Sequence, residues 1–421
     1  MKKLILLIVV ILFVMSSIAV SQKRLDYNGY IRSAKIYLGL TPKDFKMAAK
    51  RCEEAIHYYP DRPPLEAHYI LGTIYAEKNL VDSMMNHFNY ILTLCDTTTE
   101  KKVKKTCEDD KYAEQIEKIL FSTWINTYND GVKVLQDARE EEQECQEYED
   151  AMAQVECMEE SMESFEDALE YFQDATKILP DSANGWVNLG LTYLRLDDTA
   201  KAMESYIKAL EYNDTDLGLL TNLSTIHFNR GNFDSASIYF NKILEQELEP
   251  SSRADMLYNL AICKHNTGDI DSAIEVLNEV IEITPESPDV LYNRGAFKIR
   301  KTADIGRVAN DFRDSIADGK KQYQSQVDSL NEVMGDIYHS AAEDFKKVTE
   351  ISPEYRDAWE WLGNCYFYVE EWEKSAESFE ELVNLDPDYE DAWCQLAIIY
   401  TRLNQPEDRD RAAEKCSKYK D

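Results

Sequence analysis

The stretch DAWEWLGNCYFYVEEWEKSAESFEELVNLDP, residues 357–387, contains two helical patterns separated by a short charged turn. In the first pattern Trp359, Leu362, Gly363 and Tyr366 recur at i, i+3, i+4 and i+7, which places all four on one face of a helix. A glycine inside a helix costs about 1 kcal/mol relative to alanine. Gly363 therefore indicates a point where another helix has to come close.

The second pattern supplies that other helix. Ser375, Phe379 and Leu382 form its inner stripe, and we expect the small Ser375 to lie opposite Gly363. Pro387 then ends the helix and begins the turn toward the next segment. Neither helix can bury its stripe alone, so the sequence predicts units that stack on one another.

Equivalent letters recur in SANGWVNLGLTYLRLDDTAKAMESYIKALEYND (182–214), ADMLYNLAICKHNTGDIDSAIEVLNEVIEITP (254–285) and LEAHYILGTIYAEKNLVDSMMNHFNYILTLCD (65–96). The pattern resembles the tetratricopeptide repeat, a helix–turn–helix unit of about 34 residues with the letters Trp-x2-Leu-Gly-x2-Tyr, then Ala-x3-Phe, then Pro. The resemblance covers roughly residues 29–416. It implies an all-α fold, a right-handed superhelical solenoid of antiparallel helix pairs.

Two units depart from the regular length. The helix pattern WINTYNDGVKVL (124–135) is separated from its partner by the charged segment 139–163, which contains neither Gly nor Pro. LYNRGAFKIR (291–300) is likewise separated from its partner by residues 301–335. We interpret both segments as elongated helical arms that project from the stack. Because the second segment is close to one repeat in length, a degenerate additional repeat is the alternative there.

This register predicts the organisation of the chain. The predicted parts are a signal peptide or uncleaved anchor at 1–21, two repeats at 29–98, a linker at 99–110, a repeat with a helical insertion at 111–182, three regular repeats at 183–287, a repeat with an insertion or two degenerate repeats at 288–355, and two repeats with a cap at 356–421. Four lysines occupy the linker, Lys101, Lys102, Lys104 and Lys105, and we expect a loop there.

The first 21 residues have the features of a targeting sequence. Two lysines precede an apolar run, and Ala19-Val20-Ser21 offers small residues at the spacing that signal peptidase requires. This predicts an exported protein of the periplasm or cell envelope. The apolar stretch 4–20 is close to bilayer-spanning length, so a membrane anchor is the alternative. Membrane contact is expected only through this segment.

The charge of the chain restricts its partners. There are 46 basic and 79 acidic residues, and without Lys2 and Lys3 the balance is 44 − 79 = −35. Such a field repels nucleic acid and anionic lipid and favours basic partners. It is also what a solvated, aggregation-resistant surface requires. We expect a protein or peptide partner, basic if charge selects it, and neither nucleic acid nor a small-molecule substrate.

Nine cysteines cannot all pair within one molecule. No CxxC motif is present, so neither a structural zinc site nor a thioredoxin-type motif is indicated. Cys95 and Cys107 flank the lysine-rich segment and are the best candidates for a disulfide. Cys263 and Cys365 fall at helix-contact positions and are expected to be free buried thiols.

The resemblance also implies a binding surface, because the first helices of such repeats line a concave face. Partner-binding residues are expected just after the Trp/Leu anchor and one to two turns further along each first helix. The residues chosen in this way, together with the asparagine just before the Leu or its substitute in four consecutive units, are Asn188, Arg195, Asn222, Phe228, Tyr258, Asn259, His265, Tyr292, Asn293, Arg300, Asn364 and Tyr368. Within the family, an asparagine just before the Leu can bond a peptide backbone or a terminal carboxylate, and it can equally be a structural residue.

Catalytic motifs are missing from the sequence. It has no Gly-rich phosphate loop, no HExxH and no GxSxG, and its six histidines are scattered. We therefore predict a non-enzymatic protein without cofactor or metal, a protein–protein interaction scaffold of the cell envelope that binds a protein or peptide in the concave groove. The alternative is a structural, assembly or accessory subunit of an envelope complex that acts through its acidic helical arms.

Overall fold

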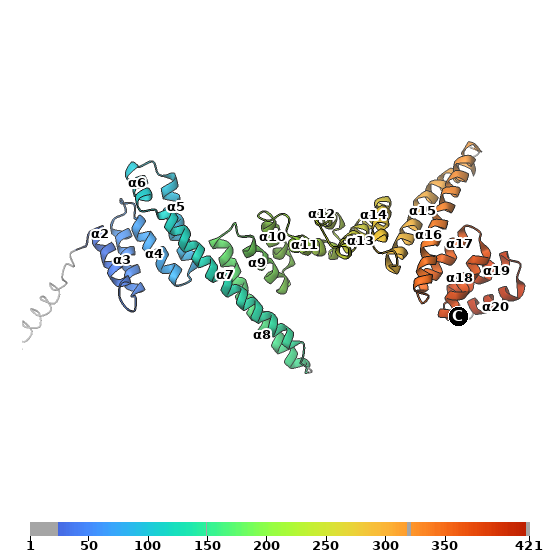
Figure 1. Ribbon diagram of the computed structural model, residues 1–421, viewed down its shortest axis with the longest axis horizontal. Coiled ribbons are helices and arrows are strands. Elements are labelled where there is room, and N and C mark those ends of the chain that lie inside the picture. The colour runs from blue at the N-terminus through green and yellow to red at the C-terminus, as the bar shows by residue number, and fades with distance from the viewer. Residues whose placement is uncertain (1–23, 149, 318–320, 418–421) are drawn as a thin grey trace, which may run out of the picture. The chain divides into compact units, whose positions relative to one another are not determined.

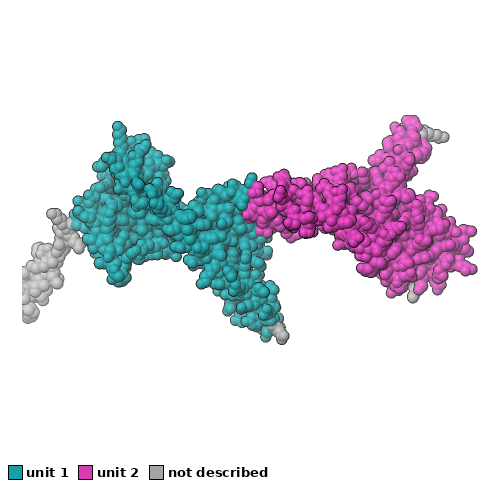
Figure 2. Space-filling model, in the orientation of Figure 1, with its two compact units in different colours: residues 1–214 teal, residues 215–421 magenta. Residues whose placement is uncertain are grey.

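The computed structural model describes residues 24–148, 150–317 and 321–417, so the predicted signal segment lies outside it. Within these residues the structure consists of α-helices and one 3-10 turn, without a strand. The chain divides into two compact units, Met1–Asp214 (unit 1) and Thr215–Asp421 (unit 2) (Figure 2). The predicted all-α class and the solenoid of helix pairs are confirmed.

Unit 1 is built from consecutive helices that pack as pairs (Figure 1). Its helices are α2 (Tyr27–Leu38), α3 (Phe45–Tyr58), α4 (Leu65–Glu77), α5 (Val81–Thr97), α6 (Lys101–Asp109), α7 (Tyr112–Cys145), α8 (Ala151–Ile178), α9 (Ala183–Arg195) and α10 (Thr199–Leu210). The pairs are α2 with α3, α4 with α5, α7 with α8, and α9 with α10.

Unit 2 repeats the same arrangement. Its helices are α11 (Leu217–Asn229), α12 (Phe233–Leu244), α13 (Pro250–Asn266), α14 (Ile270–Ile283), α15 (Pro288–Ala317), α16 (Gln324–Ile351), α17 (Arg356–Tyr368), α18 (Trp372–Leu385), α19 (Glu390–Arg402) and α20 (Pro406–Ser417), with the 3-10 turn η1 (Lys321–Tyr323) before α16. Each odd-numbered helix packs against the helix that follows it, and each second helix also packs against the next first helix.

The contact between paired helices is as the sequence predicts. A Cβ built on Gly363 would lie 2.7 Å from Cε2 of Phe379, so no side chain fits between α17 and α18 at this point. Ser375 is completely buried, and its hydroxyl donates a hydrogen bond of 2.8 Å to the carbonyl of Gly363. The small residue therefore lies opposite the glycine and also satisfies a backbone acceptor.

The tryptophan of the repeat fixes the turn that precedes its own helix. In each case the indole Nε1 donates to the carbonyl of the proline six residues earlier. The bonds are Trp186 to Pro180 (2.7 Å), Trp359 to Pro353 (2.8 Å) and Trp393 to Pro387 (2.9 Å). The Trp and Pro of the motif thus act together, because the indole N–H of the Trp satisfies the carbonyl oxygen of the Pro, which lies just beyond a helix end.

Both predicted arms are elongated helical hairpins (Figure 1). Helices α7 and α8 have 34 and 28 residues, and α15 and α16 have 30 and 28, whereas α9 has 13 and α10 has 12. In the range 288–355 the described residues form the two long helices α15 and α16, with the turn η1 before α16.

One expectation was wrong. The lysine-rich segment is not a loop but helix α6, and it packs in unit 1. Val103 is buried in the same apolar cluster as Phe88 and Tyr112, and Cys107 forms a disulfide with Cys95 on α5. Lysine is a good helix former, so four lysines allow a helix once one apolar residue and one crosslink hold it in place.

The cysteines are used in two ways. Disulfides join Cys95 to Cys107, Cys145 to Cys157 and Cys394 to Cys416, and each crosslinks helices that are adjacent along the chain. Cys52, Cys263 and Cys365 are free and buried. The predicted Cys95–Cys107 pair and the two predicted buried thiols are confirmed.

A pair of histidines in unit 1 makes its stability depend on pH. His68 on α4 and His87 on α5 face each other with Nδ1 atoms 2.8 Å apart. Burial, together with His87, lowers the pKa of His68 to about 4, and burial lowers the pKa of His87. The native state therefore holds neutral rings, while the unfolded chain takes up protons below its ordinary pKa of about 6.5.

We predict that unit 1 loses stability as the pH falls from 7 to 5.5, above the range in which carboxylates titrate. Hydrogen exchange of α4 and α5 amides should report this as faster opening at the lower pH. The double variant His68→Asn/His87→Asn should show a weaker pH dependence of that opening. An unchanged dependence in the variant would contradict the assignment.

Candidate partner-binding face

Most of the predicted groove residues lie on the first helices of unit 2. Asn188 and Arg195 are on α9 of unit 1, and the other ten are on α11, α13, α15 and α17. Arg195 forms an ion pair of 3.0 Å with Glu142 on the arm helix α7. We call the side of α11, α13, α15, α17 and α19 that carries the predicted residues and their register equivalents the first-helix face of unit 2.

Aromatic side chains connect neighbouring first helices on this face. The ring of Tyr292 on α15 stacks on Tyr355, with centroids 5.1 Å apart, and makes an edge contact with Phe345. Tyr368 at the end of α17 remains 62% exposed while it stacks on Tyr338 of α16. Burial raises the pKa of both Tyr258 and Tyr292, so both remain neutral phenols that can donate or accept hydrogen bonds.

Two other predicted residues pack near the ends of first helices. Phe228 makes edge contacts with Phe233 and Phe240 of the paired helix α12. His265 stacks on Phe297 of α15 with centroids 4.0 Å apart, and burial, with a contribution from Arg300, lowers its pKa. Such a histidine is neutral near pH 7 and serves as an aromatic surface.

The four asparagines of the motif separate into two kinds. Nδ2 of Asn293 donates to the hydroxyl of Tyr258 on the preceding first helix at 2.6 Å. Asn188 makes the same contact to Tyr128 on α7 at 2.9 Å. In both cases the side chain ties one repeat to the repeat before it, which is a structural role.

Asn222 and Asn259 occupy the same register but have no tyrosine in the preceding repeat. One repeat earlier in the sequence, the equivalent residue is Val187 for Asn222 and Thr221 for Asn259. Among the described residues neither side-chain amide has a hydrogen-bond partner, and both are half-buried. These two amides are therefore available to a ligand.

This difference gives a paired prediction. Asn293→Ala should lower the free energy of unfolding by about 1 kcal/mol, because it removes one side-chain hydrogen bond between repeats. Asn259→Ala, the same substitution one repeat earlier, should change it by less than about 0.5 kcal/mol. Urea denaturation followed by circular dichroism measures both. Equal losses would show that the two amides do not differ as described.

The remaining predicted residues are Arg300, which is exposed at the centre of α15, and Asn364, which is half-buried on α17. Our sequence reasoning missed a row of acidic residues beside them. Three first helices, α15, α17 and α19, have an aspartate as their second residue, and α13 has one at the equivalent position of the repeat. The four aspartates are Asp255, Asp289, Asp357 and Asp391. All four are exposed. The repeat register places these aspartates at equivalent positions. In a chain with 79 acidic residues, however, this recurrence does not stand out.

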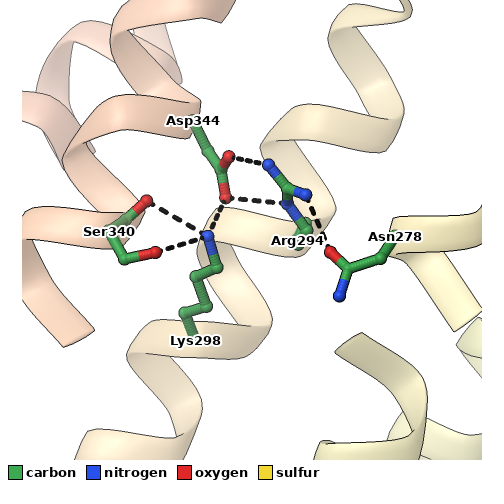
Figure 3. A network of polar contacts seen from close by, with 5 residues as sticks. All are labelled: Asn278, Arg294, Lys298, Ser340 and Asp344. Atoms are coloured by element: carbon green, nitrogen blue, oxygen red, sulfur yellow. Dashed lines mark hydrogen bonds and ion pairs between the residues drawn. The ribbon is translucent and has the colours of Figure 1, made fainter. Parts of the chain in front are cut away.

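A buried ionic network, which sequence reasoning also missed, joins arm helices α15 and α16 (Figure 3). Asp344 on α16 is only 3% exposed and accepts hydrogen bonds from Arg294 and from Lys298, the latter at 2.7 Å. Lys298 also donates to Ser340, and Arg294 donates to Asn278 of α14 at 2.8 Å (Figure 3). Burial lowers the pKa of Lys298 despite the adjacent carboxylate.

The positions of these cations explain why they were not expected. In the repeat of residues 357–387 the corresponding places hold Leu362 and Tyr366, so the motif predicts apolar packing at Arg294 and Lys298. Here the apolar pair is replaced by two cations around one buried carboxylate. The network joins the two arm helices at the base of the arm.

The described residues contain neither a metal-binding cluster nor a membrane-spanning helix. No group of three or more His, Cys, Asp or Glu side chains is arranged to hold a metal ion there. In the same part of the chain, no helix combines the length and apolarity needed to cross a bilayer.

The fold and this face define a helical repeat protein with an open interaction surface. Three family models of the tetratricopeptide repeat match the chain, at residues 183–216, 221–288 and 356–389. The matched residues are therefore tetratricopeptide repeats, as the resemblance implied. Folds of this kind typically bind other proteins and are typically not catalytic.

Comparison with solved structures gives matches over about half of the chain. YrrB, a TPR protein with an unusual peptide-binding site, is 19% identical, with 53% of this chain and 96% of that chain covered and a TM-score of 0.38. MamA 41-end from Desulfovibrio magneticus RS-1 is 22% identical, with 48% and 92% covered and a TM-score of 0.35. Among curated proteins, no sequence matches.

Proposed function

We propose that this protein is a non-catalytic interaction scaffold that holds a protein or peptide partner on the first-helix face of unit 2. The observation that carries the proposal is the difference between the asparagines. The side-chain amide of Asn293 donates a hydrogen bond to Tyr258 within the stack. Those of Asn222 and Asn259 lie on the same face without a hydrogen-bond partner among the described residues. Half-buried amides that the fold does not use are suited to the backbone of a bound chain.

Affinity capture from envelope extract, followed by mass spectrometry, tests the proposal. The variant Asn222→Ala/Asn259→Ala should lose partners that the wild-type protein captures. The matched control is Asn241→Ala/Asn384→Ala, which removes two exposed amides from the second helices α12 and α18 and should retain them. Capture that is identical for both double variants would exclude this face as the binding site.

We further propose that the protein is exported to the periplasm or cell envelope. The three disulfides support this, because such crosslinks form and persist in oxidising compartments. The amino-terminal signal segment supports it as well, with a membrane anchor as the alternative. Cell fractionation distinguishes the two, since a cleaved protein is released with the periplasm and an anchored one sediments with membranes. Recovery in the cytoplasm would contradict export.

A second candidate function is assembly through the arm formed by α7 and α8, and the exposure of apolar residues there favours it. Met152 is 83% and Val155 59% exposed, in a segment rich in glutamate that Cys145–Cys157 crosslinks. Exposed apolar residues grouped at one place often mark an interaction surface. The variant Met152→Gln/Val155→Gln should reduce self-association or partner capture. Unchanged mass in solution and unchanged partners would leave the arm without this role.

A further inference from the structure

A ladder of aspartates and tyrosines runs along the first-helix face of unit 2. Its carboxylates are the aspartates that share one position of the repeat on α13, α15, α17 and α19. Two of its tyrosines lie within α13 and α15, and the other two immediately precede α17 and α19. The members are Asp255, Asp289, Asp357 and Asp391 with Tyr258, Tyr292, Tyr355 and Tyr389. No ion pair of these four aspartates is found among the described residues.

Interactions between neighbours show that the ladder is continuous. Tyr355 stacks on Tyr292, and the carboxylates of Asp289 and Asp357 both lie close enough to help raise the pKa of Tyr355. At the next repeat, the hydroxyl of Tyr389 donates to Glu360 at 2.9 Å. Burial, the bond to Glu360 and nearby Asp391 raise the pKa of Tyr389 to about 12.

The ladder also contains a pocket of suitable size for a side chain. Asp255, Tyr258 and Asp289 line a hollow of about 230 Å³, together with the hydroxyls of Thr284 and Ser287. Two carboxylates, a phenol face and two hydroxyls make a site for a cationic head group, because a cation is attracted both by carboxylates and by the face of an aromatic ring.

Basic residues near the ladder have other partners. Arg356 pairs with Asp386 and lies over the ring of Tyr389, with its guanidinium carbon 5.4 Å from the ring centre, and Arg294 pairs with Asp344 in the buried network. Arg253 donates to the carbonyl of Leu244 at 3.2 Å. The carboxylates of the ladder are therefore not neutralised by these basic residues and can attract an external cation, in a chain whose formal net charge is −33.

We propose that the ladder binds an extended protein segment in which lysine or arginine recurs at about every third residue. This rests on the proposed function and specifies the chemistry of its partner. Packed helices lie roughly 10 Å apart, and an extended chain advances about 3.3 Å per residue. Cations spaced about three residues apart would therefore meet carboxylates of successive repeats. At the hollow between Asp255 and Asp289, the alkyl stem of the cation would lie on the ring of Tyr258.

The test uses the full chain and fluorescent peptides at about 0.15 M salt, where exposed charges are largely screened beyond about 8 Å. One peptide carries lysine at every third position. A second has the same composition with the lysines contiguous, and a third has glutamate in place of lysine. We expect binding of the spaced peptide, weaker binding of the contiguous peptide and none of the glutamate peptide.

Protein variants locate the binding. Asp289→Asn/Asp357→Asn should weaken binding of the spaced peptide about tenfold, as expected for the loss of two charge pairs. The matched control Glu279→Gln/Glu282→Gln removes two exposed charges close to the ladder in sequence, on helix α14, and should change binding less than about twofold. Equal losses in both variants, or equal binding of the spaced and contiguous peptides, would overturn the proposal in favour of unspecific charge attraction.

A selection from a random peptide library separates this proposal from the one on which it rests. Suppose that binding of the selected peptides depends on Asn222 and Asn259 but the peptides carry no spaced basic residues. The first-helix face would then remain the binding site, and the proposal for the ladder would be overturned. Selected peptides that depend on neither the amides nor the aspartates would overturn both. Spaced basic peptides that depend on Asp289 and Asp357 would support both.

Discussion

Replacing Asp344 with alanine is expected to lower the free energy of unfolding around the second arm by about 3–5 kcal/mol. The carboxylate is 3% exposed and is shared by Arg294 and Lys298. Its removal would leave two cations in a largely buried site without a counter-charge, and the desolvation of each would no longer be offset. Hydrogen exchange of amides in α15 and α16 measures the local opening free energy directly.

Two further variants make this prediction specific. Asp271→Ala removes a carboxylate that pairs with Lys301 at 2.5 Å on the surface, and it should cost no more than about 1 kcal/mol. The triple variant Arg294→Leu/Lys298→Tyr/Asp344→Ala restores the apolar letters of the repeat and should recover most of the loss. If Asp344→Ala behaved like Asp271→Ala, the network would not be the anchor of the arm.

The second large effect is expected at Gly363. Alanine is a better helix former than glycine by about 1 kcal/mol, yet Gly363→Ala should destabilise unit 2 by about 1–2 kcal/mol. The added methyl group would meet the ring of Phe379, whose nearest atoms lie 2.7 and 2.8 Å from the ideal Cβ. Overpacking of this kind typically costs about 1–3 kcal/mol, which exceeds the gain in helix propensity.

Gly335 provides the matched control. It lies inside α16 of the same unit, and a Cβ there would meet no atom within 4 Å. Gly335→Ala should therefore stabilise the protein by about 0.5–1 kcal/mol. Thermal and urea denaturation of the two variants should shift the midpoint in opposite directions. A shift in the same direction would mean that the approach of Phe379 to Gly363 does not decide the stability.

Much of the fold could be predicted because its signals are local. The spacing of Trp359, Leu362, Gly363 and Tyr366 defines a helix face whatever surrounds it, and the proline that follows defines an end. The same reasoning predicts the arms, since charged segments without Gly or Pro continue a helix. This reasoning did not predict the helix in the lysine-rich segment, because the helix depends on Val103 in the core and on the disulfide at Cys107.

The candidate site was less predictable, for a physical reason. Asn259 and Asn293 are the same residue in the same register, and no local pattern distinguishes them. Their roles differ because Tyr258 lies one repeat before Asn293, whereas Thr221 lies one repeat before Asn259. The state of each amide depends on a contact between repeats.

The sequence by itself determined that the chain forms paired helices in stacked repeats, because helical periodicity and helix-ending residues act within a few positions of the chain. Only the tertiary structure decided how the cysteines other than Cys95 and Cys107 pair, which asparagines remain available, and that Arg294, Lys298 and Asp344 form one buried network. These depend on which side chains meet across helices, and the free energy of a buried charge or amide is determined by that neighbour rather than by the residue itself.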